Sequence, residues 1–274
     1  MYWIVGMTTG PDVKELDPKE RFKASVKHNY DTRHEFLTRG NRCPNCVLVK
    51  TFCVCTQLAE LAVGIDGYCV VVLMNQREQY RSSNTAKVIE RVLGAKIFID
   101  GLEEDWSQFV SLLKEYEQRM FLLFPSEESV EFSNLVLGSG NSTVTNGEVL
   151  IVVVDGTWRQ ARKLNQRIPS SVPRVRITPT TLSKFLCRRQ TRVDRVCTAE
   201  ALSLLLLDMG LEDASKNLDS GLSAVVEGFN MQCYGSALRP ANMLKNPPQL
   251  LKPGADMLPR HPEALIGESV NSLS

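Results

Sequence analysis

The chain has 274 residues, of which 43% are hydrophobic and 23% are charged, and its net charge at pH 7 is +1. This composition excludes collagen-like, coiled-coil and wholly disordered proteins. No apolar run approaches the roughly 20 residues that span a bilayer, and the apolar start from Met1 to Met7 follows no basic segment. We therefore expect an intracellular protein, cytoplasmic or nuclear, with no signal peptide and no membrane partner.

Residues 1–40 are polar and aperiodic, which predicts an extended leader with a short helix over 18–29. A cysteine-rich segment follows at 41–60. In the main domain, 61–245, short β-branched runs alternate with helical segments, which is typical of an α/β fold with a parallel sheet and helices on both faces. Strands are expected at 67–74, 95–99, 119–125, 149–155 and 173–178, and helices at 84–94, 103–117, 158–166, 198–211 and 213–231. A loop is expected at 133–148, and the proline-rich tail, 246–274, is expected to be flexible.

Four cysteines lie close together near the start of the chain. Cys43 and Cys46 form a C-x2-C pair, and after six intervening residues Cys53 and Cys55 form a C-x-C pair. Four thiolates at this spacing can surround one tetrahedral Zn2+ and leave no position open for catalysis. In a reducing compartment, structural zinc is favoured over two local disulfides or four unligated thiols.

Polar segments follow three of the predicted strands. Ligands of open parallel sheets bind beyond the carboxyl ends of the strands, so the turn from Asp155 to Trp158 is well placed for a site, although it could equally be a capping turn with a packed indole. Pro125-Ser126 could form a second wall of the same pocket or simply leave the sheet. The segment from Arg81 to Thr85 is interpreted as a helix cap. Further along the chain, Thr198 is predicted to cap a helix, with Glu200 in its first turn.

The near-zero net charge conceals a strongly basic segment. Residues 159–195 contain eleven basic side chains and one acid, a net charge of +10, so the rest of the chain carries about −9. A dense arginine-rich segment beside a candidate pocket favours recognition of a nucleic-acid backbone over a solvated face that pairs with acids elsewhere. The basic residues are Arg159, Arg162, Lys163, Arg167, Arg174, Arg176, Lys184, Arg188, Arg189, Arg192 and Arg195.

At these residues the chain resembles the DTW-domain family, the tRNA-uridine aminocarboxypropyltransferases. The resemblance covers about residues 40–232 and rests on R-C-x2-C-x6-C-x-C at 42–55, R-x-x-N-T at 81–85, L-x-x-P-S at 122–126, D-G-T-W-x-Q-A at 155–161 and C-T-A-E-A at 197–201. One departure is Cys197, where serine or a hydrophobic residue is expected. Thr198 is still present after it.

The resemblance implies a SPOUT-like α/β fold with a knotted carboxyl half, although knots are very rare in general. It also implies S-adenosylmethionine as donor of its 3-amino-3-carboxypropyl group and N3 of a tRNA uridine as acceptor. Because uracil N3 must lose a proton before it attacks, Asp155 is the candidate general base. The residues expected around the donor are Pro125, Ser126, Thr157, Trp158, Thr198 and Glu200, and those expected to bind tRNA are Arg159, Arg162, Arg188, Arg189 and Arg192.

Two other functions are compatible with the sequence. An enzyme of the same fold could transfer methyl from S-adenosylmethionine to RNA. Alternatively, the chain could be a zinc-containing RNA-binding module without catalysis. The sequence leaves the modified uridine and the oligomeric state open.

Overall fold

The computed structural model describes residues 17–135, 137, 148–179, 182–185, 187 and 195–235. The helices in this part of the chain are α1 (Pro18–Arg39), α2 (Cys55–Glu60), α3 (Ala86–Leu93), α4 (Glu103–Glu115), α5 (Trp158–Asn165), α6 (Thr198–Asp208) and α7 (Glu212–Tyr234), with short 3-10 turns at Lys50–Phe52 and Phe132–Asn134. The strands are β1 (Tyr68–Asn75), β2 (Lys96–Asp100), β3 (Met120–Leu123), β4 (Val130–Glu131), β5 (Val149–Asp155) and β6 (Arg174–Arg176).

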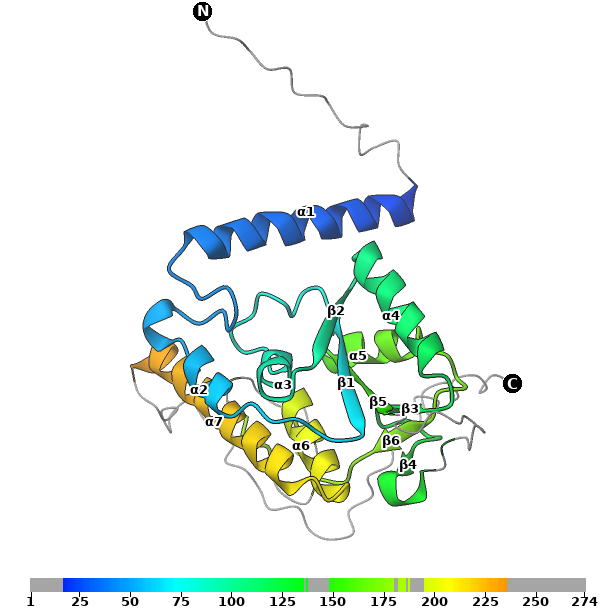
Figure 1. Cartoon of the computed structure of the whole chain (residues 1–274). Helices are drawn as coiled ribbons and strands as arrows, with labels where there is room; N and C mark the ends of the chain where they lie inside the picture. Colours follow the sequence, from blue (N-terminus) through cyan, green and yellow to red (C-terminus); the bar gives the residue numbers. More distant parts are fainter. Residues whose placement is uncertain are drawn as a thin grey trace, which may run out of the picture.

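The strands form one sheet in the order β2-β1-β5-β3-β6-β4, and every neighbouring pair is parallel (Figure 1). The central strands β1 and β5 are apolar without alternation because helices cover both faces. The predicted α/β class, with a parallel sheet and helices on both faces, is confirmed. The two-residue strand β4 was not predicted.

Two separate layers of apolar side chains flank the sheet. On one face, α3, α6 and α7 pack on residues such as Val72 and Ile151. On the other, α4 and α5 pack on residues such as Val71 and Val152. The helix predicted at 103–117 contributes α4 to this layer, with Phe109 and Leu113 buried and Trp106 and Tyr116 packed at its margin.

The prediction of an extended leader with a helix ending near residue 29 is wrong, because α1 continues to Arg39. Asp17 caps the helix by accepting hydrogen bonds from the backbone N–H groups of Lys19 and Glu20, and Pro18 fits the first turn. Beyond residue 29 the helix is held by tertiary contacts that its own sequence does not predict. The side chain of Leu37 is buried, and the Tyr30 carbonyl accepts a hydrogen bond from the Tyr80 hydroxyl.

Several predictions concern residues outside the described part of the chain. The flexible tail at 246–274 and most of the loop at 133–148 lie there. A carboxyl knot depends on the path between β6 and α6, which includes undescribed residues, so the SPOUT-like knot stays a prediction. Among the described helices, none combines the length and apolar character that crossing a bilayer requires.

Candidate active site

Asp155, the last residue of β5, joins three segments that are far apart in the sequence. Its side chain is only 4% exposed. The Asn84 Nδ2 group donates to Asp155 Oδ2 at 2.5 Å, and the Thr198 hydroxyl donates to Asp155 Oδ1 at 2.6 Å. The carboxylate therefore holds the entry to α3 and the first turn of α6 against the carboxyl end of the central strand.

Asn84 belongs to the R-x-x-N-T segment noted in the sequence, but it was not predicted as a site residue. Because a carboxylate only accepts hydrogen bonds, the Asn84 amide nitrogen must face Asp155, which fixes the orientation of the amide. The opposite atom, Asn84 Oδ1, is buried and has no hydrogen-bond partner among the described residues. A buried acceptor of this kind is costly unless water or a ligand meets it. The sequence signal that could have identified Asn84 as a site residue is its position, just before a helix that follows a central strand.

The interpretation of Arg81 to Thr85 as a simple helix cap is wrong. Thr85 occupies the cap position of α3, but its hydroxyl makes no capping hydrogen bond to that helix. Instead Thr85 Oγ1 accepts from the backbone N–H of Ala199 in α6 at 3.4 Å. Thr198 also differs from its prediction, since it is the first residue of α6 and Cys197 takes the cap position. Both threonines thus join α3, β5 and α6.

Lys87 is a buried cation beside this network. Burial lowers the pKa of its ammonium from 10.5 to about 8, while the negative charges of the Cys46 thiolate and the Asp155 carboxylate act in the opposite direction. Its Nζ donates to the Arg81 carbonyl at 3.3 Å. The segment 81–87 is therefore electrostatically coupled both to Asp155 and to the cysteine cluster.

Trp158 opens α5, as predicted, behind a capping box. The Thr157 hydroxyl accepts from the Gln160 N–H, and the Gln160 side chain accepts from the Thr157 N–H at 2.7 Å. The indole packs near Phe124, with ring centroids 6.4 Å apart, and the Arg195 guanidinium lies 4.4 Å from its centroid. Because Arg195 covers one face of the ring, Trp158 is better suited to form a wall than to stack on a base through that face.

The other residues expected around the donor occupy different settings. Pro125 is exposed and Ser126 is half-buried in a turn closed by Ser129, whose hydroxyl donates to the Ser126 carbonyl at 2.7 Å. The carboxylate of Glu200 is buried and accepts from the Cys197 N–H and from the backbone of Lys184. In this conformation Glu200 fixes the segment before α6.

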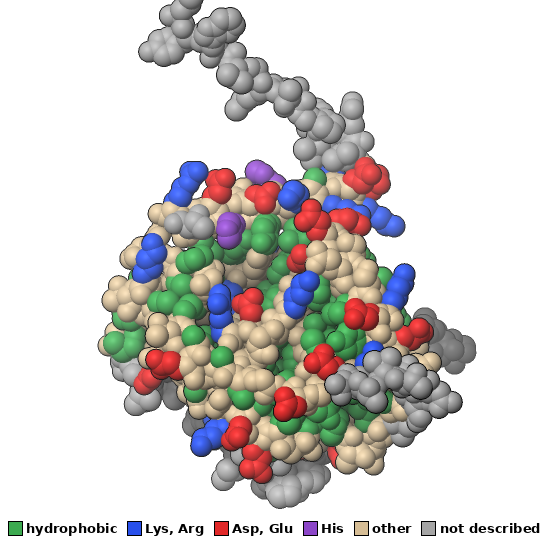
Figure 2. Space-filling view, viewed as in Figure 1, with side chains coloured by type: hydrophobic (Ala, Val, Ile, Leu, Met, Phe, Trp, Pro, Cys, Tyr) green, Lys and Arg blue, Asp and Glu red, His purple; other side chains and the backbone are tan. Residues whose placement is uncertain are grey.

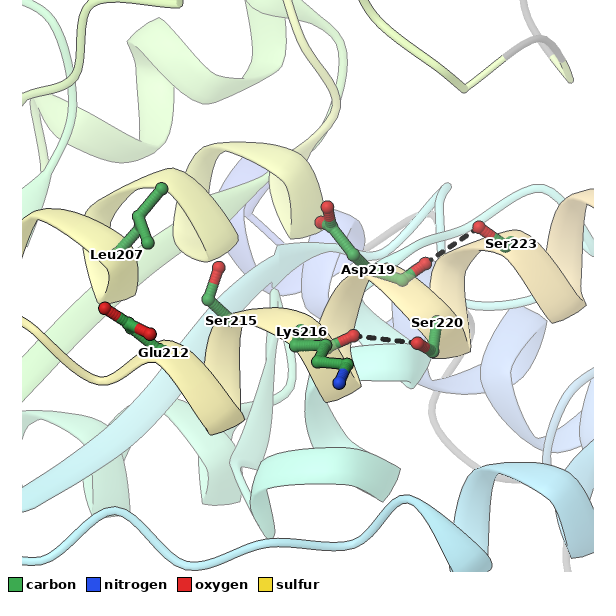
Figure 3. Close-up of a pocket in the computed structure, with 7 residues that line it drawn as sticks. All are labelled: Leu207, Glu212, Ser215, Lys216, Asp219, Ser220 and Ser223. Carbon is green, nitrogen blue, oxygen red and sulfur yellow. Dashed lines mark hydrogen bonds between the residues drawn. The ribbon is translucent and has the colours of Figure 1, made fainter.

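Two surface hollows lie away from Asp155. One, of about 410 Å³, lies along α6 and α7 between Leu207 and Ser223, where the Ser220 and Ser223 hydroxyls donate to backbone carbonyls of α7 (Figure 3). The other, of about 790 Å³, lies between Ser126 and the segment after α5. Of the residues predicted around the donor, only Ser126 lines either hollow.

The four cysteines fit a tetrahedral metal ion. Their sulfur atoms all lie within 4.8 Å of one another, with Cys43 Sγ 3.6 Å from Cys55 Sγ and Cys46 Sγ 3.8 Å from Cys53 Sγ. Sulfurs about 2.3 Å from a shared zinc ion would lie about 3.8 Å apart at tetrahedral angles. A disulfide would bring them to about 2.05 Å, so the alternative of two local disulfides is excluded in this structure.

The surroundings of this cluster also favour a metal site. Burial alone would raise the pKa of Cys43, but hydrogen bonds from the backbone of Cys46 and Asn45 and from two neighbouring thiols lower it to about 7. Val47 has φ of 64°, which is strained for a β-branched residue, and its N–H donates to the Cys43 carbonyl at 2.9 Å. A tight turn held around thiolates is what a closed four-sulfur site requires.

The basic segment is only partly available to a ligand. Arg174 donates to backbone carbonyls of the segment after α5, Arg176 donates to the Ser129 carbonyl, and Arg167 pairs with Asp100. Arg159 and Arg162 are exposed on α5. The remaining predicted RNA-binding residues, Arg188, Arg189 and Arg192, lie outside the described residues.

The model of the DTW domain matches residues 40–230, a span that includes the cysteine cluster, the segment 81–87, Asp155 and α6. The chain belongs to the DTW-domain family. This family is linked to tRNA modification. No solved structure matches the chain. The DTW match begins at residue 40, directly after α1 ends at Arg39, so the whole helix precedes it.

Proposed function

We propose that this DTW domain transfers the 3-amino-3-carboxypropyl group of S-adenosylmethionine to N3 of a tRNA uridine. The observation that carries the proposal is the family match over residues 40–230, which contains the buried Asp155 network at the carboxyl edge of the sheet. In open parallel sheets, ligands bind at this edge. The proposal includes the SPOUT-like arrangement, with its knotted carboxyl half.

The reaction is a displacement at carbon. Uracil N3 loses its proton, its electron pair forms a bond to the γ-carbon of the donor, and the bond from that carbon to the sulfonium breaks. The products are 3-(3-amino-3-carboxypropyl)uridine and neutral methylthioadenosine. Because the sulfonium is already an activated leaving group, the protein must chiefly align the γ-carbon with N3 and remove the N3 proton.

Asp155 is the proposed general base. Its hydrogen bonds to Asn84 and Thr198 fix the direction of both carboxylate oxygens. Since only 4% of its surface is exposed, the proposal requires the covering side chains to shift when the substrates bind. Trp158, with Arg195 on its face, would form a wall of the donor pocket. Exposed Arg159 and Arg162 would contact tRNA phosphates.

The cysteine cluster has a structural role in this proposal. Cys43, Cys46, Cys53 and Cys55 would hold one Zn2+, which cross-links the segment before β1 and offers no open position. The segment is also tied to α7, because Gln232 Oε1 accepts from the Val49 N–H at 2.8 Å. Helix α2 begins at Cys55 and packs against α3, the helix that Asn84 precedes.

The by-product of the reaction tests the proposal. Incubation of the full chain with tRNA and labelled S-adenosylmethionine should release methylthioadenosine, and nucleoside mass spectrometry should find the modified uridine. Release of S-adenosylhomocysteine alone would instead indicate methyl transfer. RNA binding with no donor binding by calorimetry would favour the non-catalytic module.

A further inference from the structure

The helix α1 lies beside the candidate active site, although the whole helix precedes the matched DTW domain. The side chain of Val26 packs where Gly101 follows β2, the Tyr30 carbonyl accepts from Tyr80 beyond β1, and Lys23 pairs with Glu103. In Figure 1, α1 crosses above β2 and the amino end of α4. The helix therefore runs over the carboxyl ends of β2 and β1, next to β5.

This helix is held by a narrow stripe of contacts. Among its described side chains only Val26 and Leu37 are buried, and Ala24 and Tyr30 are half-buried. Most helices owe their stability to an apolar face packed on a core, and an isolated helix of this length is marginal in water. The broad outer face of α1 is thus presented to solvent at the edge that bears the site.

Beside the packed stripe, α1 carries exposed side chains that suit RNA. Lys19, Val26 and Arg33 lie seven residues apart, nearly two full turns, so the two basic side chains are on the packed side of the helix and not on its outer face. The helix has six basic and three acidic residues and both described histidines, and Figure 2 shows these charged side chains gathered along it. Lys19 and Arg33 form no ion pair with any described residue. Phe22 and Phe36 are 53% and 71% exposed. Exposed aromatic rings among basic groups can stack on unpaired bases while the cations neutralise phosphates.

We infer that α1 is a docking surface for the tRNA strand that flanks the modified uridine. This inference rests on the proposed function. Neighbouring strands lie about 4.8 Å apart, so the end of β2, beneath α1, is roughly 10 Å from the end of β5. At about 3.4 Å per nucleotide along a helical strand, roughly three nucleotides cover that distance. Nucleotides about three positions from a uridine at Asp155 are therefore within reach of α1.

Charge removal provides the first test. The double variant Lys19→Gln/Arg33→Gln should weaken binding of unmodified tRNA about tenfold and lower the slope of log affinity against log salt by about two. The matched control Lys114→Gln/Lys216→Gln removes the same charge at the ends of α4 and α7 that lie at the opposite edge. The control should leave both quantities unchanged. Equal effects of the two double variants, or none from the first, would overturn the inference.

Aromatic substitution distinguishes RNA from an apolar partner. Phe36→Leu keeps an apolar side chain but removes the stacking ring, so it should weaken tRNA binding several-fold, as Phe36→Ser should. Circular dichroism and melting temperature should show that α1 is intact in both. The inference fails if Phe36→Leu binds tRNA like the wild type. It also fails if α1 variants lose binding to anionic phosphatidylserine vesicles but keep full binding to tRNA.

The readouts separate this inference from the proposed function. If wild-type protein releases no methylthioadenosine yet α1 variants lose tRNA affinity, the reaction is wrong while the docking surface stands. If the wild type is active and the Lys19→Gln/Arg33→Gln variant has an unchanged KM for tRNA, the docking surface is wrong and the reaction stands.

Discussion

The substitution Asp155→Asn tests the base without dismantling the network around it. An asparagine has the shape of aspartate, its Oδ1 can accept from Asn84 Nδ2, and its Nδ2 can donate to the Thr198 hydroxyl oxygen. Both hydrogen bonds thus persist as neutral ones, while the ability to take a proton is lost. Hydrogen bonds to charged groups exceed neutral ones by about 1 kcal/mol each, so the variant should lose about 2 kcal/mol of stability.

Asp155→Ala is less informative than Asp155→Asn. It leaves the Asn84 amide and the Thr198 hydroxyl as buried donors without an acceptor. Each orphaned donor costs about 1 to 3 kcal/mol, and together they approach the whole stability of a marginal domain. A loss of activity in that variant would not separate catalysis from folding.

The assay is single-turnover release of methylthioadenosine from labelled donor with saturating tRNA. General base catalysis contributes about 10² to 10⁴ in rate, and Asp155→Asn should lose that factor while its melting temperature falls by only a few degrees. The control Thr198→Val removes one hydrogen bond to the same carboxylate but keeps the base, so it should lose much less rate. Turnover of Asp155→Asn within threefold of the wild type would refute the base and leave Asp155 a positioning residue.

Three further predictions concern the frame around the site. Cys46→Ser should abolish stoichiometric zinc binding, measured by elemental mass spectrometry, and a variant that retains full zinc would contradict the four-sulfur site. Acidification should release zinc from the wild type, because a cysteine must lose its proton to bind the metal. Burial lowers the pKa of Lys87 from 10.5 to about 8, so the unfolded chain binds more protons between these values and stability rises with pH there. Lys87→Met should remove that rise and stabilise the protein by up to about 3 kcal/mol at pH 7, measured by urea denaturation, and an unchanged pH profile would contradict it. A Cβ at Gly221 would lie 2.9 Å from Val88 Cγ1 and 3.1 Å from Val92 Cγ2. Gly221→Ala should therefore lower the free energy of unfolding by about 1 to 3 kcal/mol. A neutral effect would show that α3 and α7 can separate freely.

Local patterns predicted most of the elements but few of the site contacts. The apolar run at 149–155 and the threonine before Trp158 indicated β5 and the start of α5, and both are confirmed. Thr85 and Thr198 have the right residue type for helix caps, yet both hydroxyls turn to other segments. A cap and a tertiary hydrogen bond use the same hydroxyl, and sequence spacing does not say which partner is near.

The basic segment also separates what the sequence predicts from what only the structure decides. The sequence established a block of +10 charge within a nearly neutral chain. The structure decided that Arg174 holds the carbonyls after α5, that Arg167 pairs with Asp100, and that Arg159 and Arg162 face solvent. Charge is a property of composition, whereas the availability of a charge depends on what folds against it.

By itself the sequence determined the parallel α/β architecture and the cysteine spacing that suits a metal, because hydrophobic periodicity and ligand spacing are local. Only the tertiary structure decided that Asn84, Asp155 and Thr198 form one network and that α1 extends to Arg39 across the same edge. These outcomes depend on contacts between segments far apart in the chain. The free energy that stabilises these contacts comes from burial and hydrogen bonds, which exist only after the sheet has assembled.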